Sequence, residues 1–205
     1  LLFSATMPKE ISKLIQTILV NPLTVKVAPV SSTVDAISQR VYFVEKKNKT
    51  KLLISILKKS PSVTSAIVFM RTKRGTDQLA KELRQAGIAA QSIHGDKTQW
   101  ERQQTLKDFK NHQIQILVAT DIAARGINVD RLSHVFNYDL PDVAETYVHR
   151  IGRTGRAGEE GVAIALCSPE EKPLLDGVEK LIRKKIKVLN DQRYSLSTSD
   201  SRLTA

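Results

Sequence analysis

The chain has 205 residues, of which 41% are hydrophobic, and its formal net charge is +11. That length is enough for one well-buried domain with a small part of a second. The excess of Lys and Arg favours polyanionic partners, although charge alone does not separate nucleic-acid-binding proteins from other basic proteins. The single cysteine, Cys167, excludes an intramolecular disulfide and a cysteine-based metal cluster, and it favours a reducing, cytoplasmic setting.

No segment has the basic start, apolar run and small-residue cleavage site of a signal peptide. No apolar run approaches the roughly 18–20 residues that span a bilayer, so we expect no membrane partner. The sequence begins at Leu1 rather than Met, and its first residues already have the pattern of folded protein. We therefore expect the chain to be part of a longer protein.

The first element expected is a helix at residues 9–20, which has its apolar residues on one face and stops at Asn21 and Pro22. A short strand is predicted at 23–27, and the polar segment 29–38 indicates a linker.

Beyond this linker, predicted strands and helices alternate. Strands are expected at 40–44, 65–69, 89–93, 114–119, 132–137 and 162–166. Helices are expected at 51–59, 76–85, 98–109, 142–151 and from 168 onward, with cap signals at Thr98 and Glu101, Asp142 and Glu145, and Ser168 and Glu171. The alternation predicts an α/β fold with a parallel sheet covered by helices on both faces. The tail from Asn190 has little to bury, so we expect it to be mobile.

The segment 147–156, with the sequence YVHRIGRTGR, carries the strongest chemical signal. Arg153 and Arg156 follow a predicted helix, and Gly155 between them lets the chain turn tightly. Two guanidinium groups at this spacing can converge on a transferring phosphoryl group, whose negative charge is spread over several oxygens. The alternative is a solvated basic patch at a helix end, and the paired glycines favour the first interpretation.

Three further segments follow predicted strand ends, where ligands collect in open parallel sheets. The segment 118–128 is expected to expose Thr120 and Asp121 to a phosphate or ribose, although Asp121 could equally cap a helix. In 93–102, the amides around Gly95 can hold a phosphate. Trp100 in that segment could stack on a base, but we expect it to pack in the core, as aromatic residues of amphipathic helices commonly do. The segment 69–73 again combines basic and hydroxyl groups.

Taken together and in order, these segments resemble the motifs of DEAD-box RNA helicases over residues 1 to about 188. Residues 2–8, LFSATMP, are similar to the Ser-Ala-Thr motif of the family's first RecA-like domain, and RIGRTGR is highly specific. The spelling around ATDIAARG is most similar to bacterial RhlE-like members. The resemblance implies a RecA-like, P-loop NTPase-type fold with the first domain ending at 1–28, a linker at 29–38, the second domain at 39–188 and a mobile tail at 189–205.

The resemblance also implies ATP with Mg²⁺, bound mainly by the first domain, and three groups of site residues. The ATP site would contain the arginine fingers Arg153 and Arg156, together with Gly126 and Asn128. Coupling between ATP and domain closure would involve Ser4, Thr6, His149 and Arg150. RNA backbone would be bound by Arg71, Thr72, Gly95, Gln99, Arg102, Thr120 and Asp121.

Two departures from the family pattern limit what the chain can do. Asn128 stands where the family usually has Asp, so we expect nucleotide affinity to be retained but weaker. The sequence contains neither the G-x-x-x-x-G-K-[ST] phosphate loop nor the Asp-Glu-Ala-Asp motif, so the chain alone should not hydrolyse ATP. The apolar face predicted within 1–28 is expected to pack on the second domain or on another copy by exchange.

The resemblance therefore implies one half of an ATP-dependent RNA helicase, which grips the RNA sugar-phosphate backbone and couples ATP hydrolysis to local duplex unwinding. Two alternatives remain open from the sequence. The first is a DNA helicase or translocase of the same superfamily, and the second is a non-catalytic RNA-binding module.

Overall fold

The computed structural model describes residues 9–19, 21–23, 25, 36–125, 127, 129, 132–155, 161–191, 193 and 194. The chain divides into two units at Val30 and Ser31. In the first unit, the described residues form the helix α1 (Lys9–Ile18), in agreement with the helix predicted at 9–20. Leu23 and Val25 lie outside regular secondary structure, so the strand predicted at 23–27 does not form at these positions, and its other residues lie outside the described part.

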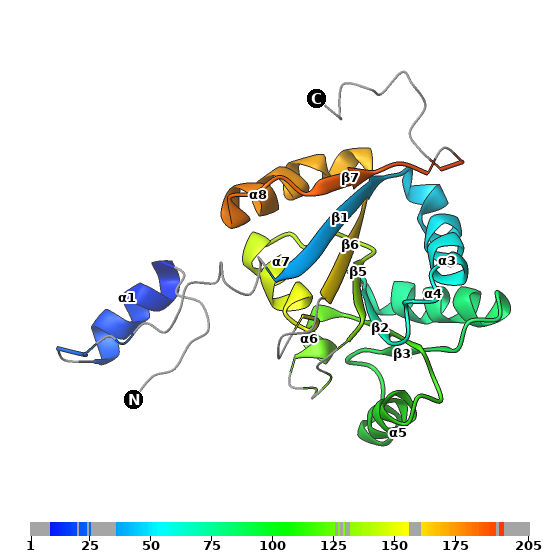
Figure 1. Cartoon of the computed structure of the whole chain (residues 1–205). Helices are drawn as coiled ribbons and strands as arrows, with labels where there is room; N and C mark the ends of the chain where they lie inside the picture. The colour runs from blue at the N-terminus through cyan, green and yellow to red at the C-terminus, as the bar shows by residue number, and fades with distance from the viewer. Residues whose placement is uncertain are drawn as a thin grey trace. The chain divides into compact units, whose positions relative to one another are not determined.

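The second unit is built on a seven-stranded sheet in which all neighbouring strands of the described residues run parallel (Figure 1). The strand order is β3-β4-β2-β5-β6-β1-β7. The strands are β1 (Ile37–Phe43), β2 (Ala66–Phe69), β3 (Ala90–Ile93), β4 (Ile116–Ala119), β5 (His134–Asn137), β6 (Gly161–Cys167) and β7 (Lys187–Leu189). This arrangement confirms the predicted α/β class with a parallel sheet.

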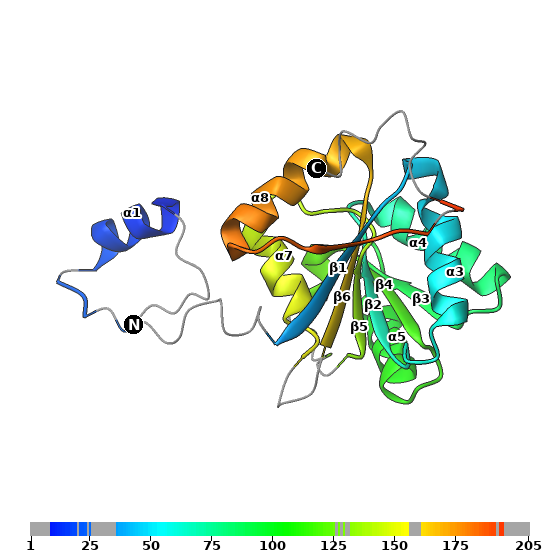
Figure 2. The same cartoon turned by 45° about the horizontal axis from the view of Figure 1, so that its top comes forward.

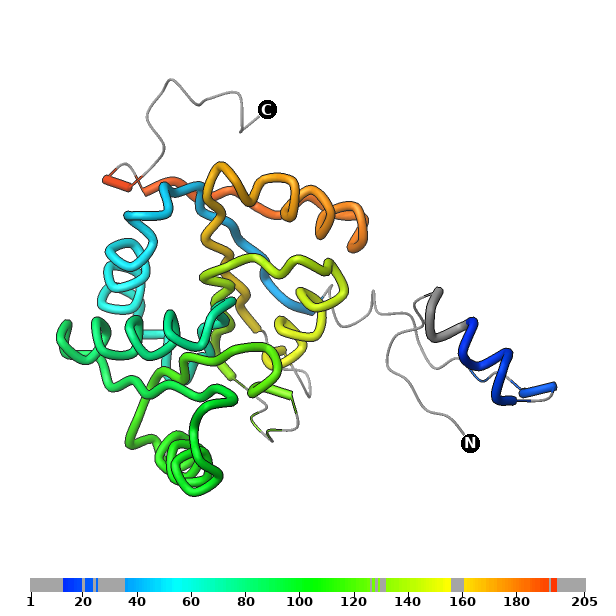
Figure 3. Tube along the Cα trace, turned by 180° about the vertical axis from the view of Figure 1, so that it is seen from behind, coloured from blue at the N-terminus to red at the C-terminus, as the bar shows by residue number. Residues whose placement is uncertain are grey.

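Helices cover both faces of this sheet (Figure 2). They are α3 (Lys49–Lys59), α4 (Lys73–Gln85), α5 (Gln99–Lys110), α6 (Asp121–Ala124), α7 (Ala144–Ile151) and α8 (Lys172–Ile182), with 3-10 turns η1 (Lys46–Asn48) and η2 (Pro169–Glu171). The helices α3 and α4 pack on one face, and α5, α6, α7 and α8 contribute buried residues to the other. Views from opposite sides show α5 at the β3 end of the sheet and α8 at the β7 end (Figures 1 and 3).

The central strands are buried on both faces, which explains their continuous apolar sequences. All four residues of β2, β4 and β5 are buried. Alternate residues divide between the two cores: Val68 and Val118 face α3 and α4, whereas Ile67 and Leu117 face the opposite helices. Near-continuous apolar runs of this kind are typical of parallel strands covered on both sides, so the sequence could predict them.

Two of the three predicted helix caps are confirmed. Thr98 with Glu101 and Ser168 with Glu171 both form capping boxes. The third is wrong, because α7 has Val143 at its N-cap and no side-chain cap there. The Asp142 carboxylate lies 3.3 Å from the Arg71 guanidinium instead, so a long-range ion pair replaces the local cap.

The edges of the predicted domain differ in detail from the structure. The strand β1 begins at Ile37, inside the segment predicted as a linker. The short edge strand β7 was not predicted, because three residues are too few to show a pattern. Beyond it, Arg193 donates a hydrogen bond to Ser55 and Tyr194 packs against the α3–α4 core, so the start of the predicted tail is attached to the domain.

Cys167 in β6 is buried, as predicted. Burial, assisted by the Glu171 carboxylate, raises the pKa of its thiol to about 12, so the side chain stays protonated at neutral pH. Within the part of the chain that the structure describes, no helix is both long and apolar enough to cross a membrane.

Candidate functional site

The carboxyl ends of β3, β4 and β2 are adjacent in the sheet, and the predicted RNA-binding residues follow them. Arg71 and Thr72 come after β2, and Gly95 comes after β3. Thr120 and Asp121 come directly after β4. Gln99 and Arg102 lie in the first turns of α5, which leaves the β3 end. We call this group of loops and helix starts the carboxyl edge.

Thr72 is an exposed N-cap whose geometry depends on a glycine. Its hydroxyl oxygen accepts a hydrogen bond of 3.1 Å from the Gly75 amide at the start of α4. A Cβ at Gly75 would lie only 2.7 Å from that oxygen, so the sequence needs glycine for this cap. An accepting hydroxyl still has its own proton to donate, and Thr72 can therefore cap the helix and contact a phosphate oxygen together.

Gly95 is exposed, and the fold itself does not require a glycine there. A Cβ at this position would approach nothing closer than the Lys73 Cε, at 3.6 Å, which is an ordinary contact. The loop is fixed by buried His94, whose Nε2 lies 2.9 Å from the Asp77 carboxylate and whose Nδ1 accepts the Asp96 amide. Because glycine has no side chain, the backbone of this hydrogen-bonded loop stays accessible to a ligand.

Asp77 anchors this loop from α4. Burial works against its charge, but hydrogen bonds from Ser92, Lys97 and His94 hold the pKa of its carboxyl group below the usual value. Asp77 therefore remains ionised at neutral pH and keeps His94 oriented. The sequence offered no sign of this role, because Asp77 lies on an otherwise ordinary helix.

The predicted exposure of Thr120 is wrong, since only 8% of the residue is accessible. The reason is that α6 begins directly after it and buries Ala123 and Ala124 against the sheet. Asp121, the first residue of α6, is partly exposed.

The prediction that Trp100 packs in the core is also wrong, because 72% of the residue is exposed. The helix α5 buries only Thr105 and Phe109, both in its second half. The first turn therefore projects from the core at the carboxyl edge. An amphipathic pattern cannot show which turn of a helix extends past the sheet.

Arg71 is held at the carboxyl edge by the loop between β5 and α7. Its backbone amide donates to Asp139, and its guanidinium donates to the Leu140 carbonyl at 3.0 Å. The side chain remains 47% exposed beside the Asp142 carboxylate. Its orientation is thus fixed while one side stays accessible.

A buried ion pair supports the same loop and was not visible in the sequence. Lys49, which is 1% exposed, donates to the Glu171 carboxylate at 2.5 Å and to the Tyr138 carbonyl at 2.7 Å. The second oxygen of Glu171 accepts the Leu140 amide. The two residues are 122 positions apart, and only the fold brings them together.

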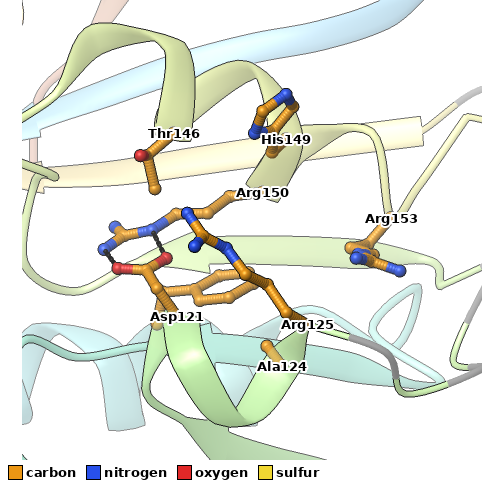
Figure 4. A pocket seen from close by; sticks show the side chains of 8 residues that line it. Asp121, Ala124, Arg125, Thr146, His149, Arg150 and Arg153 are labelled. Carbon is orange, nitrogen blue, oxygen red and sulfur yellow. Dashed lines mark hydrogen bonds and ion pairs between the residues drawn. The ribbon is translucent and has the colours of Figure 1, made fainter. Parts of the chain in front are cut away.

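A second group of residues surrounds a shallow pocket between α6 and α7, which we call the arginine pocket (Figure 4). It is lined by Phe69, Asp121, Ala124, Arg125, Thr146, His149, Arg150 and Arg153. Four of these have the spacing i, i+3, i+4 and i+7 along α7 and the residues after it, so they share one helical face. His149, Arg150 and Arg153 were predicted site residues, whereas Thr146 was not. Arg125, which follows α6 directly, lines the pocket from the other side.

Arg150 is the most constrained of these side chains, with 2% of the residue exposed. Its Nε and one terminal nitrogen each donate to an Asp121 oxygen at 2.7 Å (Figure 4). The other terminal nitrogen donates to the Asn137 side chain and to the Asp139 carbonyl. The guanidinium also lies 4.9 Å from the centre of the Phe69 ring. Arg150 therefore links α7 to the ends of β2, β4 and β5.

The backbone at Arg153 lies at the opposite edge of the sheet from Thr72 and Gly95. Its carbonyl accepts the amide of Leu132, just before β5, and the Thr154 hydroxyl donates to the Leu132 carbonyl. This segment therefore differs from the three that follow the carboxyl ends of strands. Gly155 turns the chain with φ +64°, and a Cβ there would lie 2.8 Å from Ile37, which confirms its predicted role.

The sequence model of the helicase conserved C-terminal domain family matches residues 48–158, more than half of the chain. The chain belongs to this family. The DEAD-box ATP-dependent RNA helicase CshA of Bacillus subtilis is 45% identical over 187 residues, which are 91% of this chain and 37% of that protein. The chain thus spans about two fifths of the length of the curated relatives it matches.

Two solved structures show which type of helicase domain this chain resembles. The DEAD-box protein SrmB of E. coli, bound to regulator of ribonuclease activity A, is 40% identical with a TM-score of 0.75, covering 79% of this chain and 95% of that one. Dbp5 of S. cerevisiae, bound to RNA and ADP BeF3, is 29% identical with a TM-score of 0.80, covering 98% and 52%. The chain is a RecA-like C-terminal domain of the DEAD-box type. Its assignment to the RhlE-like members stays a prediction.

Some residues implied by the DEAD-box resemblance lie outside the described part of the chain. They are Ser4, Thr6, Gly126, Asn128 and Arg156. Their roles stay predictions. Among the residues that are described, no three His, Cys, Asp or Glu side chains form a group that could hold a metal ion.

The charges of the arginine pocket suit a phosphate ligand for this helicase domain. Three guanidinium groups and one imidazole line it against a single carboxylate. That carboxylate, Asp121, is already bound by Arg150 on both oxygens. Arg125 and Arg153 add two further guanidinium groups to the lining, and guanidinium groups suit the oxygens of a phosphate.

Proposed function

We propose that this chain is the RNA-gripping and arginine-supplying half of an ATP-dependent RNA helicase. The observation that carries the proposal is the Asp121–Arg150 ion pair. It joins the carboxyl edge, where backbone and hydroxyl groups are exposed, to the arginine pocket, which three arginine side chains line. A residue pair that touches both surfaces is what a protein needs to couple RNA binding to nucleotide chemistry.

The carboxyl edge would hold the sugar-phosphate backbone of single-stranded RNA. Thr72 offers a hydroxyl, Gly95 an open stretch of backbone, and Arg71 and Arg102 offer guanidinium groups. Groups of this kind bind phosphates and position the strand without reading base identity. Affinity should therefore depend strongly on salt and only slightly on sequence.

The arginine pocket would approach ATP that is held with Mg²⁺ mainly by the first RecA-like domain. ATP supplies the free energy that drives the helicase cycle. The part of this chain is to bring Arg153, on a backbone pinned by Thr154 and turned by Gly155, against the phosphates when the two domains close. The guanidinium would stabilise the negative charge that develops as the terminal phosphoryl group is transferred. Arg156 and Asn128 would complete the nucleotide contacts.

Arg150 and His149 would couple the two surfaces, in line with the resemblance. Among the described contacts, the Arg150 guanidinium is directed to Asp121 at the end of β4, within the same domain. Closure on ATP would therefore move α7 and the carboxyl edge together. Contacts from these two side chains to Ser4 and Thr6 stay predictions, as does self-association through residues 1–28.

The rival function from a different substrate class is a DNA helicase or translocase. Several of the relatives are named as RNA helicases, which favours RNA. A stand-alone RNA-binding module would not need a second surface lined by arginine side chains. We infer a cytoplasmic protein, because Cys167 is a free, buried thiol, which suits a reducing compartment.

The proposal is tested by measuring ATP hydrolysis and strand separation by the full-length protein with RNA and with DNA of the same sequence. We expect RNA to stimulate hydrolysis strongly and DNA to stimulate it little, because the 2′-hydroxyl distinguishes the two backbones. The 205-residue chain alone should show no turnover, since its sequence has no phosphate loop. Equal stimulation by both nucleic acids, or hydrolysis by the chain alone, would contradict the proposal.

The substitution Gly95→Ala should separate RNA binding from folding. A Cβ at Gly95 makes only an ordinary contact with Lys73, so the melting temperature should change little. The methyl group would obstruct a backbone that approaches closely, and we expect about a tenfold loss of RNA affinity, or about 1.4 kcal/mol. Salt-dependent binding of single-stranded RNA by full-length protein measures this.

Gly177→Ala is the matched control for that experiment. Gly177 lies within α8, and a Cβ there would have nothing within 4 Å. Ala should raise helix stability by roughly 0.5–1 kcal/mol and leave RNA affinity unchanged. If Gly95→Ala binds RNA as tightly as Gly177→Ala does, the backbone at Gly95 is not part of the RNA site.

A further inference from the structure

Trp100 is the only tryptophan of the chain, and it lies largely exposed in the first turn of α5. Aromatic side chains bury large areas and usually end up inside a fold or at an interface. The described part of the chain contributes no ring contact to Trp100. An exposed indole at a ligand-binding edge therefore indicates contact with another molecule.

The neighbours of Trp100 indicate the chemistry of that partner. Gly95 and Gln99 are exposed just before it in the sequence. Two residues after it, the Nε of Arg102 is buried and has no hydrogen-bond partner in the structure. Leaving a buried donor unpaired costs free energy. A bound ligand that brings an acceptor to this nitrogen would remove that cost. The turn thus combines an unsatisfied cationic donor with a flat apolar ring.

A nucleotide has the complementary combination of an anionic phosphate and a flat base. The start of a 12-residue helix adds positive electrostatic potential for the phosphate. An apolar protein surface would leave the Arg102 nitrogen unpaired, because it brings no anion. A single-stranded polynucleotide satisfies both groups at once.

We propose that Trp100 stacks on a base of the bound RNA strand, beside the phosphate that is held by the segment from Gly95 to Arg102. The inference rests on the proposed RNA-binding function and adds a base contact to a site that otherwise meets only sugar and phosphate. A stacking contact of this kind is worth about 1–3 kcal/mol per base and tolerates any sequence. It should still favour purines, whose larger rings overlap more of the indole.

The single tryptophan makes the inference directly measurable in the 205-residue chain, which contains the whole second unit. Oligoadenylate of about ten nucleotides is titrated against the chain, and indole fluorescence is followed together with the anisotropy of a dye on the RNA. We expect the fluorescence to be quenched, and the quenching to saturate at the same RNA concentration as the anisotropy.

Substitutions at Trp100 then measure the contact. Trp100→Ala should weaken RNA binding by about five- to 150-fold, which corresponds to the stacking energy of one base. Trp100→Phe should recover most of the affinity, because it keeps an aromatic ring. Both variants should melt as the wild type does, since the residue is largely exposed.

An abasic oligonucleotide of the same length is the matched control, because it keeps the phosphates and removes the bases. The wild-type chain should bind it as weakly as Trp100→Ala binds normal RNA, and Trp100→Ala should not distinguish the two ligands. RNA binding without quenching, and with equal affinity for Trp100→Ala, would overturn the inference and leave the proposed function intact. Fluorescence that changes with protein concentration in the absence of RNA would also overturn it, by showing that a second copy covers Trp100. If the wild-type chain binds RNA neither by indole fluorescence nor by anisotropy, the proposal that the carboxyl edge binds RNA is itself contradicted.

Discussion

Arg153→Ala in the full-length protein should lower RNA-stimulated ATP turnover by at least tenfold, while RNA affinity stays unchanged. Arginine fingers of other NTPases are worth about 10³–10⁵ in rate, which sets the upper range. The loss should fall on kcat rather than on KM, because the guanidinium would act on charge that develops only in the transition state. Steady-state hydrolysis with saturating RNA measures the effect.

The structure gives a reason to expect that Arg153 affects chemistry but not RNA binding. Its backbone is pinned beside Leu132, at the amino end of β5, whereas Thr72 and Gly95 lie at the carboxyl ends of their strands. Contacts made from opposite ends of the strands can be lost independently of one another. A change at Arg153 that weakened RNA binding as much as turnover would contradict this separation.

Two further variants make the Arg153 experiment specific. Arg153→Lys keeps the charge but not the planar fork, so it should recover only part of the rate. Lys187→Ala removes an exposed cation from the edge strand β7 and should leave turnover unchanged. If Arg153→Ala behaves as Lys187→Ala does, then Arg153 is a surface charge and the catalytic part of the proposal fails.

Much of the fold could be predicted from the sequence because its signals are local. The runs at β2 and β4 are apolar without interruption, and the capping boxes at Thr98 and Ser168 involve residues three positions apart. Gly155 adopts a positive φ in the turn after α7, a conformation that glycine permits without steric cost. Each of these features follows from a few consecutive residues, which is why a single sequence was enough.

The site was harder to predict because its key contacts join distant segments. Lys49 and Glu171 form a buried pair across most of the domain, and Asp142 pairs with Arg71 rather than capping its own helix. The burial of Thr120 depends on a helix of four residues, too short to leave a pattern. Partners of this kind are set by the order of strands in the sheet, which composition and periodicity do not encode.

Arg150→Ala should be the most destabilising single substitution at the site, lowering the free energy of unfolding by about 3–5 kcal/mol. It removes a buried cation and leaves Asp121 without its ion pair, while the Asn137 side chain and the Asp139 carbonyl each lose a donor. For a chain of this size, the melting temperature should fall by about 6–20 °C. Thermal unfolding of the 205-residue chain measures it.

Arg125→Ala is the matched control, because Arg125 lines the same pocket but is exposed. Its effect on stability should stay within about 0.5 kcal/mol, as for most surface substitutions. A double-mutant cycle between Asp121→Ala and Arg150→Ala should give a coupling free energy of about 0.5–3 kcal/mol, since the two side chains share two hydrogen bonds. Additive effects would show that the ion pair contributes nothing to stability.

The same residue also tests the coupling between the two surfaces, through the milder variant Arg150→Lys. A lysine keeps the charge, but it cannot hold both oxygens of Asp121 and reach Asn137 and the Asp139 carbonyl together. Below its melting temperature, the full-length variant should still bind RNA and ATP, yet RNA should stimulate its ATP turnover several-fold less than in the wild type. Normal stimulation in a folded Arg150→Lys protein would mean that the link is purely structural, and that closure reaches the RNA edge by another route.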